Sequence, residues 1–304
     1  MSFNYKSLIK SRNVRIWIMS ILSFVPDKIM LKIQYKIKTG RKLNLTNPQR
    51  YTEKLQYYKL NYRNPLMKQC ANKYEVRKYV IDCGLEHILN DLIGVYDSPN
   101  DIKFEELPNQ FVAKDNLGGG GNSVLVCLDK DKLDIASVKN EMKRWCKRTK
   151  GKHPGREWVY DNQEKKIVIE KYLSQEDGDL PDYKFFCFNG KVVFSYLMEN
   201  YSMHHDQGRL GFFDKDFNLL PYHRKDFAPI TVQPEKPKNY EKMVEYAEIL
   251  SKNFPHVRVD FYNIDGKIYF GELTFFMASG YLNFEPDEFD FIMGKEFDLS
   301  TLYE

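Results

Sequence analysis

Four consecutive glycines and one lysine form the first group of residues that could bind a ligand. Lys114 ends the apolar segment F-V-A-K, and the segment S-V-L-V follows the glycines, which are Gly118, Gly119, Gly120 and Gly121. The β-branched segment after the glycines is typical of a strand, which excludes a P-loop because P-loop glycines open a helix. We expect a glycine-rich hairpin whose N–H groups can contact phosphate oxygens beside the Lys114 ammonium; the alternative is a surface loop without a ligand.

Two acids, Asp260 and Glu272, form the second group. Asp260 lies in the segment V-R-V-D-F-Y, and Glu272 lies in Y-F-G-E-L-T. Asp265-Gly266 between them is typical of a hairpin turn, so the two acids are expected near each other across paired strands. Facing carboxylates repel unless a cation lies between them, and Mg²⁺ accepts one or two carboxylates together with substrate phosphates. The alternative is two exposed acids with ordinary surface partners. Arg258, on the same face as Asp260, is a candidate ligand for phosphate or carboxylate.

The elements that must position these residues follow from periodicity and turn signals. Helical patterns occur at residues 44–60, 72–83, 134–148 and 239–253. Strand patterns occur at residues 92–98, 111–114, 123–128 and 167–173, and Asn189-Gly190 predicts a second hairpin. Antiparallel strands with a few helices predict an α+β architecture rather than a parallel βαβ array.

Composition and charge limit the possible functions. The chain of 304 residues is 42% hydrophobic, and its five cysteines include no C-x-x-C pair, so we expect a folded protein without a zinc site or disulfide framework. The net charge is +4, yet the first fifty residues carry eleven basic residues and one acid, Asp27. A nucleic-acid partner is not expected, because the remainder of the chain is acidic.

The basic N-terminal segment contains the apolar run I-W-I-M-S-I-L-S-F-V-P at residues 16–26. This run is too short to cross a bilayer, which needs about 20 apolar residues, and no small-residue cleavage site follows it. Two interpretations remain open. The segment is either a helix pair packed on the main domain or a basic amphipathic segment that rests on an anionic membrane surface.

Taken in order, the motifs resemble those of ATP-grasp enzymes, and more narrowly those of the TupA-like ATP-grasp proteins of bacterial polysaccharide gene clusters. The resemblance covers roughly residues 43–290. Its segments are A-N-K-Y-E-V-R, F-V-A-K-D-N-L-G-G-G-G, I-E-K-Y-L, P-D-Y-K-F-F-C-F-N-G-K, V-R-V-D-F-Y and G-E-L-T. It implies an α+β fold in which two lobes grip the nucleotide. The implied parts are a basic helical segment (1–60), an N-terminal lobe with the glycine-rich loop (61–166) and a C-terminal lobe with a magnesium-binding hairpin (167–304).

The resemblance also implies the residues that bind ATP. The phosphates would contact Lys73 and Lys114, and the glycines from Gly118 to Gly121 would close over them. The segment between the lobes would line the adenine pocket, chiefly through backbone groups. Its residues are Glu170, Lys171, Tyr172 and Leu173.

For the metal and the reaction, the resemblance implies a further set. Mg²⁺ would be held by Asp260, Glu272 and Thr274, and Thr274 stands where related enzymes have asparagine. The catalytic residues, which would meet phosphate or an acyl phosphate, are Lys184 and Arg258. Two segments depart from the TupA-like pattern: Leu117 and Gly119 replace a histidine and a serine before and within the loop, and Met277-Ala278 replace a proline-glycine pair.

The implied activity is an ATP-dependent carboxylate–amine ligase that forms an amide through an acyl phosphate. The implied substrates are an amino acid or amine and a uronic acid of a surface polysaccharide or its precursor. The implied location is the cytoplasm, with a peripheral position at the inner face of the cytoplasmic membrane as an option. Three alternatives stay open: a glycosyltransferase, a Mg·ATP phosphotransferase, and an inactive membrane-associated homologue that acts as an assembly partner.

Overall fold

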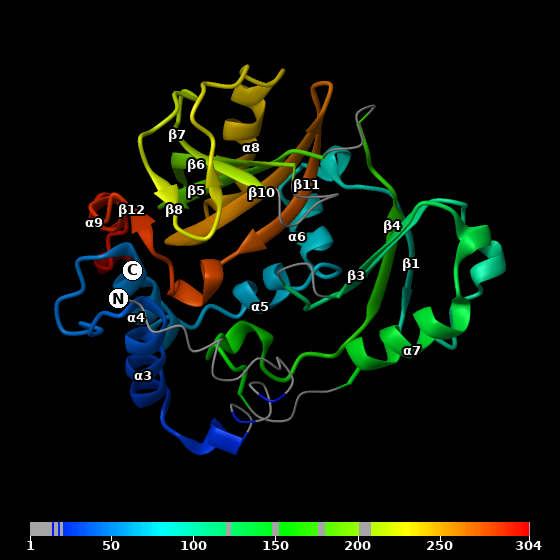
Figure 1. The fold of residues 1–304 in the computed structure, drawn as a ribbon, viewed down its shortest axis with the longest axis horizontal. Helices are drawn as coiled ribbons and strands as arrows, with labels where there is room; N and C mark the ends of the chain where they lie inside the picture. Colours follow the sequence, from blue (N-terminus) through cyan, green and yellow to red (C-terminus); the bar gives the residue numbers. More distant parts are fainter. Residues whose placement is uncertain are drawn as a thin grey trace.

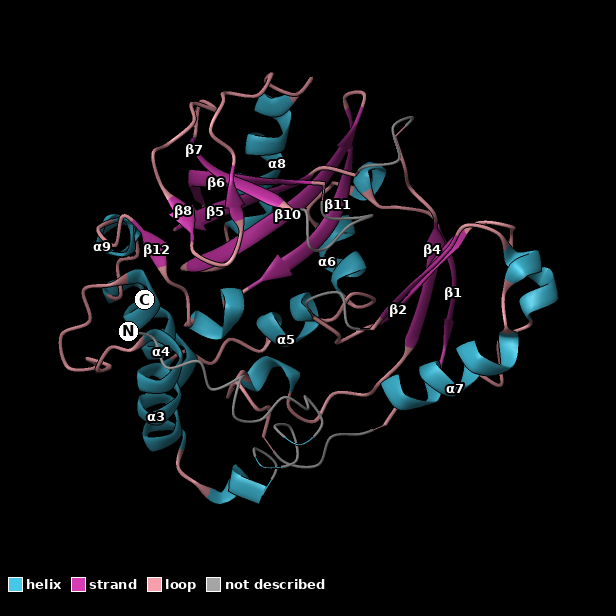
Figure 2. Cartoon of the chain, in the orientation of Figure 1, coloured by secondary structure: helices cyan, strands magenta, loops and turns pink. Residues whose placement is uncertain are grey.

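Two largely antiparallel sheets of unequal size dominate the computed structural model, which describes residues 14, 18, 21–119, 123–147, 152–175, 180–200 and 208–303. Figure 1 shows the smaller sheet, β1 to β4, on the right and the larger sheet above the centre, with helices between and around them. Figure 2 shows the same mixture of helices and strands. The predicted α+β architecture is confirmed.

The small sheet has the strand order β1-β4-β2-β3, and every neighbouring pair is antiparallel. Its strands are β1 (Leu92–Tyr96), β2 (Phe111–Asp115), β3 (Val124–Cys127) and β4 (Ile167–Lys171). One face packs its apolar side chains against α7 (Ile135–Trp145), whose first turn is capped by Asp134. The other face therefore remains for the polar residues of β2 and β4, because side chains alternate along a strand.

The large sheet has the order β11-β10-β5-β6-β7-β9. Its strands are β5 (Asp182–Phe188), β6 (Lys191–Glu199), β7 (Arg209–Asp214), β9 (Ala228–Pro229), β10 (His256–Ile264) and β11 (Lys267–Thr274). The turn residues Asn189 and Asp265 have positive φ angles, as do the glycines that follow them, which closes the two predicted hairpins. Helix α8 (Tyr240–Ser251) packs on β5, β6 and β10. A third, two-stranded sheet pairs β8 (His223–Arg224) with β12 (Phe284–Glu285).

Short helices join the main core, which is centred on the large sheet. They are α4 (Tyr51–Asn61), α5 (Leu66–Ala71), α6 (Val76–Asp82) and α9 (Phe289–Glu296). Glu53 fixes the start of α4, because its carboxylate accepts hydrogen bonds from the backbone N–H groups of Gln49 and Arg50. Helix α3 (Asp27–Thr39) packs beside α4 and ends at Gly40, which adopts the left-handed conformation with φ 76°.

The lobe boundaries expected at residues 60 and 166 remain a prediction, and two observations bear on where the chain changes sheets. Strand β4 pairs with β1 and β2, so the small sheet extends to Lys171. Helices α5 and α6 share the core of the large sheet although they precede the small sheet in the chain. No helix in the described residues is long and apolar enough to cross a membrane.

Candidate active site

One face of the large sheet carries most of the charged residues selected from the sequence. Along β10, Arg258, Asp260 and Tyr262 alternate with fully buried apolar residues, so their side chains share one face. Strand pairing sets Asp260 opposite Glu272 of β11 and opposite Lys184 of β5. The predicted proximity of the two acids across the hairpin is confirmed.

A β-bulge at Gly271 determines where Glu272 lies on β11. Asp260 pairs with Glu272, but Phe261 pairs with Phe270, which makes Gly271 the extra residue. A Cβ atom at Gly271 would lie 3.0 Å from the backbone oxygen of Asp260. Glycine therefore allows the strands to approach closely at the two acids.

Asp260 is 1% exposed and is bound by two cations. Its oxygens accept hydrogen bonds from Arg258 Nε at 2.7 Å, from Arg258 Nη2 at 2.6 Å and from Lys184 Nζ at 2.6 Å. Lys184 also forms an ion pair with Asp182. Burial alone would lower the pKa of Lys184, but Asp182 and Asp260 raise it above its ordinary value. The ammonium group therefore stays charged, and Asp260 holds both cations in place.

Glu272 is the accessible acid of the pair, with a side chain that is 39% exposed. Its Oε1 atom accepts hydrogen bonds from Thr274 Oγ1 at 3.0 Å and from Arg258 Nη2 at 3.2 Å. Burial would raise the pKa of Glu272, but the positive charges of Lys73, Lys184 and Arg258 lower it to about 2. The carboxylate is therefore ionised at neutral pH.

Three oxygen atoms converge on a single nitrogen, Nη2 of Arg258. This atom lies 2.6 Å from Asp260 Oδ2, 2.9 Å from Thr274 Oγ1 and 3.2 Å from Glu272 Oε1. The cation between the two acids is thus a guanidinium group. Carboxylate and hydroxyl oxygens are also the hard ligands that Mg²⁺ accepts, so the residues predicted for the metal fit one chemically. The described part of the chain contains no group of three or more His, Cys, Asp or Glu residues that could hold a metal.

A second cluster of charged side chains lies on the polar face of the small sheet. Lys114 of β2 donates to Glu170 Oε2 of β4 at 2.8 Å, and Arg77 of α6 lies 3.4 Å from the other oxygen of Glu170. Burial lowers the pKa of Lys114, but Glu170 and Tyr262 raise it above its ordinary value overall. Lys114 therefore keeps its positive charge beside the glycine-rich segment.

Lys73 lies directly against the start of the glycine run. Its backbone N–H donates to the Asn116 carbonyl at 2.8 Å, and its ammonium donates to the Gly118 carbonyl. Burial lowers the pKa of Lys73 below its ordinary value. Gly118 is tightly packed, since an added Cβ would lie 3.1 Å from both the Asp115 and the Ser123 side chains, whereas Gly119 has open space beside it. Gly120 and Gly121, also predicted to bind phosphate, lie outside the described residues.

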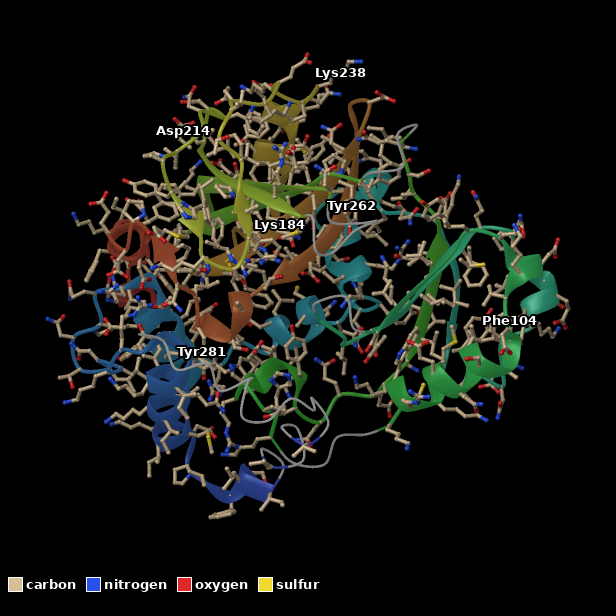
Figure 3. All side chains as sticks on the ribbon, in the orientation of Figure 1. Phe104, Lys184, Asp214, Lys238, Tyr262 and Tyr281 are labelled. Carbon is tan, nitrogen blue, oxygen red and sulfur yellow. The ribbon has the colours of Figure 1, made fainter. Side chains whose placement is uncertain are left out.

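Charged groups of the two sheets lie close enough to shift one another's pKa values. Burial, the largest influence, acts to lower the pKa of Lys73 and of Lys114, and the negative charge of Glu272 in the large sheet acts in the opposite direction. Burial, followed by Asp182, raises the pKa of Tyr262 to about 12, and Lys114 of the small sheet acts in the opposite direction. Figure 3 shows Lys184 and Tyr262 in the middle of the molecule, where β10 approaches the small sheet. The residues selected from distant parts of the sequence therefore come together.

The segment predicted to line the adenine pocket is only partly available to a ligand. The Lys171 N–H donates to the Asp91 carbonyl at 3.0 Å, and its carbonyl accepts from the Asn90 side chain at 2.8 Å. Its side chain, 63% exposed, pairs with the Asp91 carboxylate at 3.3 Å. A backbone N–H for adenine would therefore come from Tyr172 or Leu173. Lys171 and Tyr172 line a surface depression at the end of β4.

Sequence reasoning missed three residues that the structure adds to the site: Asp182, Tyr262 and Arg77. Asp182 precedes Lys184 by two residues, and Tyr262 follows Asp260 by two, so the strand period alone places each on the polar face. Arg77 ends the A-N-K-Y-E-V-R motif. Its contact with Glu170 depends on where the folded chain brings the side chain of Arg77 relative to β4, which no local pattern indicates.

Leu117 and Met277, which depart from the TupA-like pattern, are both buried in the structure. Leu117 is buried, with 8% exposed, and its N–H donates to the Asp115 carboxylate at 2.9 Å. Met277 is 1% exposed and belongs to the main core. Ala278 and Ser279 follow it with φ angles of 45° and 55°, so this turn after β11 is held in a left-handed conformation without glycine at either position.

An α+β fold of two largely antiparallel sheets, with Lys114 of the small sheet and the paired acids of the large sheet in one charged region, is the arrangement expected of the ATP-grasp class. The profile of the TupA-like ATPgrasp family matches residues 53–298, so the chain belongs to this family. No curated protein sequence matches the chain.

Several solved structures are similar to this one. D-Alanine–D-alanine ligase from Helicobacter pylori is 17% identical, with 83% of this chain and 67% of that chain covered and a TM-score of 0.48. The Bacillus anthracis enzyme, complexed with ATP, is 19% identical, with 67% and 53% covered and a TM-score of 0.39. Phosphoribosylamine–glycine ligase from Thermotoga maritima is 12% identical, with 70% and 49% covered and a TM-score of 0.41. The chain thus spans about half to two thirds of these proteins, and similarities of this size carry no argument about its substrates.

Proposed function

We propose that this protein is an ATP-dependent carboxylate–amine ligase that forms an amide through an acyl phosphate. The observation that carries the proposal is that four basic side chains act on the charge of the exposed Glu272 carboxylate: Arg258 by direct contact at 3.2 Å, and Lys73, Lys114 and Lys184 by longer-range electrostatic interaction. Four cations around one accessible acid suit a polyphosphate and its metal better than a neutral substrate. Membership of the TupA-like ATP-grasp family supports the same assignment.

Each residue has a role in the proposed reaction. Lys73 and Lys114 neutralise the ATP phosphates, and the glycines cover them with backbone N–H groups. Asp260, Glu272 and Thr274 would hold Mg²⁺, which supplies further neutralisation of phosphate oxygens. Lys184 and Arg258, fixed by Asp260, stabilise the phosphoryl group during its transfer.

The proposed reaction consists of two successive displacement steps. A carboxylate oxygen of the first substrate attacks the γ-phosphorus, the bond to the β-phosphate oxygen breaks, and ADP leaves. The nitrogen of a neutral amine then attacks the acyl carbon, the carbon–oxygen bond breaks, and inorganic phosphate leaves as the amine loses a proton. One carboxylate oxygen therefore ends in the released phosphate.

For the substrates, we propose a uronic acid of a surface polysaccharide or its precursor as the carboxylate and an amino acid or amine as the acceptor. The support is the TupA-like motif set, which is typical of polysaccharide gene clusters. A lipid-linked precursor would explain the basic N-terminal segment. We include peripheral contact of that segment with the membrane in the proposal.

The test is ADP release from Mg·ATP in the presence of candidate sugar acids, with and without amines, using carboxylates labelled with ¹⁸O. The proposal predicts ADP release only when both substrates are present, with ¹⁸O in the inorganic phosphate. ADP release with a sugar alone, giving a phosphorylated sugar whose transferred phosphoryl group contains no ¹⁸O, would indicate a phosphotransferase. Release of a nucleoside diphosphate from a nucleotide sugar would indicate a glycosyltransferase, and the absence of any nucleotide binding would indicate an assembly partner.

A further inference from the structure

Helix α3 is anchored firmly by one face. Its buried residues are Met30, Leu31, Gln34, Tyr35 and Thr39. Tyr35 forms a 2.8 Å hydrogen bond with Thr52 of α4, and Leu31 and Tyr35 pack with Leu43 and Tyr281. Gln34 donates to the Pro154 carbonyl at 2.9 Å. The opposite face of α3 therefore has a fixed orientation on the outside of the molecule, at the lower left of Figure 1.

The outer face of α3 carries an unusual row of apolar side chains. Ile29, Ile33 and Ile37 are 51%, 48% and 38% exposed. Their spacing of four residues places them one above the other along the helix. Single exposed apolar residues are ordinary on a protein surface, but a continuous row on a well-anchored helix indicates an interaction surface.

A row of lysines runs beside the isoleucines. Lys28, Lys32 and Lys36 have the same four-residue spacing, and Lys32 and Lys36 lie three residues after Ile29 and Ile33, so the two rows are adjacent on the helix surface. Lys36 donates to the Gly40 carbonyl at 2.9 Å and closes the end of the helix. Lys28 and Lys32 instead line a surface depression together with Lys42, Leu43 and Thr46.

The one acidic residue of α3 does not neutralise the lysines on its outer face. Asp27 is the only acidic residue in the first fifty positions. Its carboxylate lies 2.7 Å from Lys152 and 3.8 Å from Arg156, on the side of the residue 152–156 segment. The three lysines of the depression therefore present their charge beside an exposed apolar row.

We propose that the outer face of α3, together with Lys42, binds the surface of an anionic lipid bilayer. The isoleucine row enters the boundary between headgroups and acyl chains, and Lys28, Lys32 and Lys42 bind headgroup phosphates. Adjacent apolar and basic rows are the arrangement of helices that lie in the plane of a membrane, where lysines reach up to the headgroups along their aliphatic stems. Charge complementarity favours anionic lipid over a neutral protein partner.

This inference deepens one part of the proposed function, the peripheral membrane contact, by assigning it to named residues. It does not depend on the ligase reaction, because vesicle binding is measured without nucleotide or substrate. The variant Lys114→Met should bind vesicles as the wild type does, whatever its activity. Failure of the two proposals can therefore be told apart.

The test is co-sedimentation of the full chain with vesicles of phosphatidylcholine alone or mixed with phosphatidylglycerol, at low and high salt. Binding should require phosphatidylglycerol and weaken with salt. Lys28→Gln/Lys32→Gln should lower the partition coefficient by about 25-fold, since each lysine near an anionic surface contributes about fivefold. Ile29→Ser/Ile33→Ser should lower it by about tenfold or more while leaving the charge unchanged.

Matched controls replace similarly exposed residues elsewhere. Ile81→Ser/Ile135→Ser removes two exposed isoleucines from α6 and α7, and Lys132→Gln/Lys143→Gln removes two lysines near α7; both should bind as the wild type does. Circular dichroism and melting temperature check that every variant is folded. Binding of both α3 variants equal to that of the wild type would overturn the proposal.

Other occupants of the surface give distinct results, and each would overturn the proposal. A concentration-dependent dimer in light scattering that the isoleucine variant abolishes, without vesicle binding, would identify a second copy of the chain. Complete competition by inorganic phosphate at millimolar concentration, with no effect of the isoleucine variant, would identify a free-phosphate site. No binding of the wild type to anionic vesicles would remove the membrane interface.

Discussion

Replacement of Lys114 by methionine separates nucleotide binding from folding. Methionine keeps most of the aliphatic volume of lysine but cannot neutralise a phosphate. A hydrogen bond to a charged group contributes about 1.5–3 kcal/mol, which corresponds to a loss of about 10- to 150-fold in affinity for Mg·ATP. The loss should be the same for Mg·ADP only if Lys114 contacts the phosphates that both nucleotides share.

The cost of Lys114→Met in stability should be smaller. Lys114 is 25% exposed and its partner Glu170 is 13% exposed, so the ion pair is partly screened by water. Arg77, 3.4 Å from Glu170, remains to neutralise the carboxylate after the substitution. We expect a decrease of about 1 kcal/mol in the free energy of unfolding.

The assay is isothermal titration with Mg·ATP, accompanied by urea unfolding of each variant. Lys166→Met is the matched control, because Lys166 is also 25% exposed and also pairs with one carboxylate, that of Asp97 at 2.6 Å. Lys166→Met should keep wild-type affinity. Equal affinity of wild type and Lys114→Met, or an equal loss in both variants, would refute the placement of Lys114 at the phosphates.

Three further predictions follow from buried or strained groups. The positive charges around Glu272 lower its pKa from 4.5 to about 2 in the folded protein, so its ionised form stabilises the fold above about pH 4.5. This stabilisation is lost as the pH falls toward 2. In acid titrations, the difference in unfolding free energy between wild type and Glu272→Gln should therefore shrink over that range. Lys59, 1% exposed, donates to the Gln56 side chain and to the Gly155 and Ser279 carbonyls, and burial lowers its pKa from 10.5 to about 7. Between pH 7 and 10.5 Lys59 is protonated in the unfolded chain but not in the folded protein, so the free energy of unfolding should rise with pH over this range, by ~3–5 kcal/mol at most. Lys59→Met should lack this rise in urea unfolding. Ala278→Gly should raise the unfolding free energy by about 1 kcal/mol, because the φ angle of 45° is strained for alanine; a lower melting temperature would contradict this explanation.

Local sequence signals were sufficient for the hairpins and for the approximate proximity of the two acids. Asn189-Gly190 and Asp265-Gly266 specify tight turns because few other residue pairs adopt positive φ angles easily. Once the second turn is fixed, an unbroken ladder would set Asp260 opposite Gly271 and would place Glu272 on the other face of the sheet. The bulge at Gly271 shifts the register by one residue and brings Glu272 opposite Asp260, and the sequence shows this bulge only as a glycine in a strand.

Tertiary packing decides the features that the sequence did not reveal. Arg258 joins both acids and Thr274 because its guanidinium group reaches along its own strand to Asp260 and across to β11, which depends on the side-chain conformation rather than on spacing. The contact between Arg77 and Glu170 joins a helix and a strand that are 93 residues apart in the chain. The hydrogen bond from the Lys171 N–H to the Asp91 carbonyl likewise follows from the pairing of β4 with the segment before β1.

The most direct test of the site is the dependence of ATP binding on Mg²⁺ in the wild type and in Glu272→Gln. Glu272 is ionised and 39% exposed, and its removal leaves Asp260 still bound to Arg258 and Lys184. We predict that Mg²⁺ increases the affinity of the wild type for ATP and that this increase is lost in Glu272→Gln. An equal increase in both proteins, or no binding of ATP to the wild type, would contradict it.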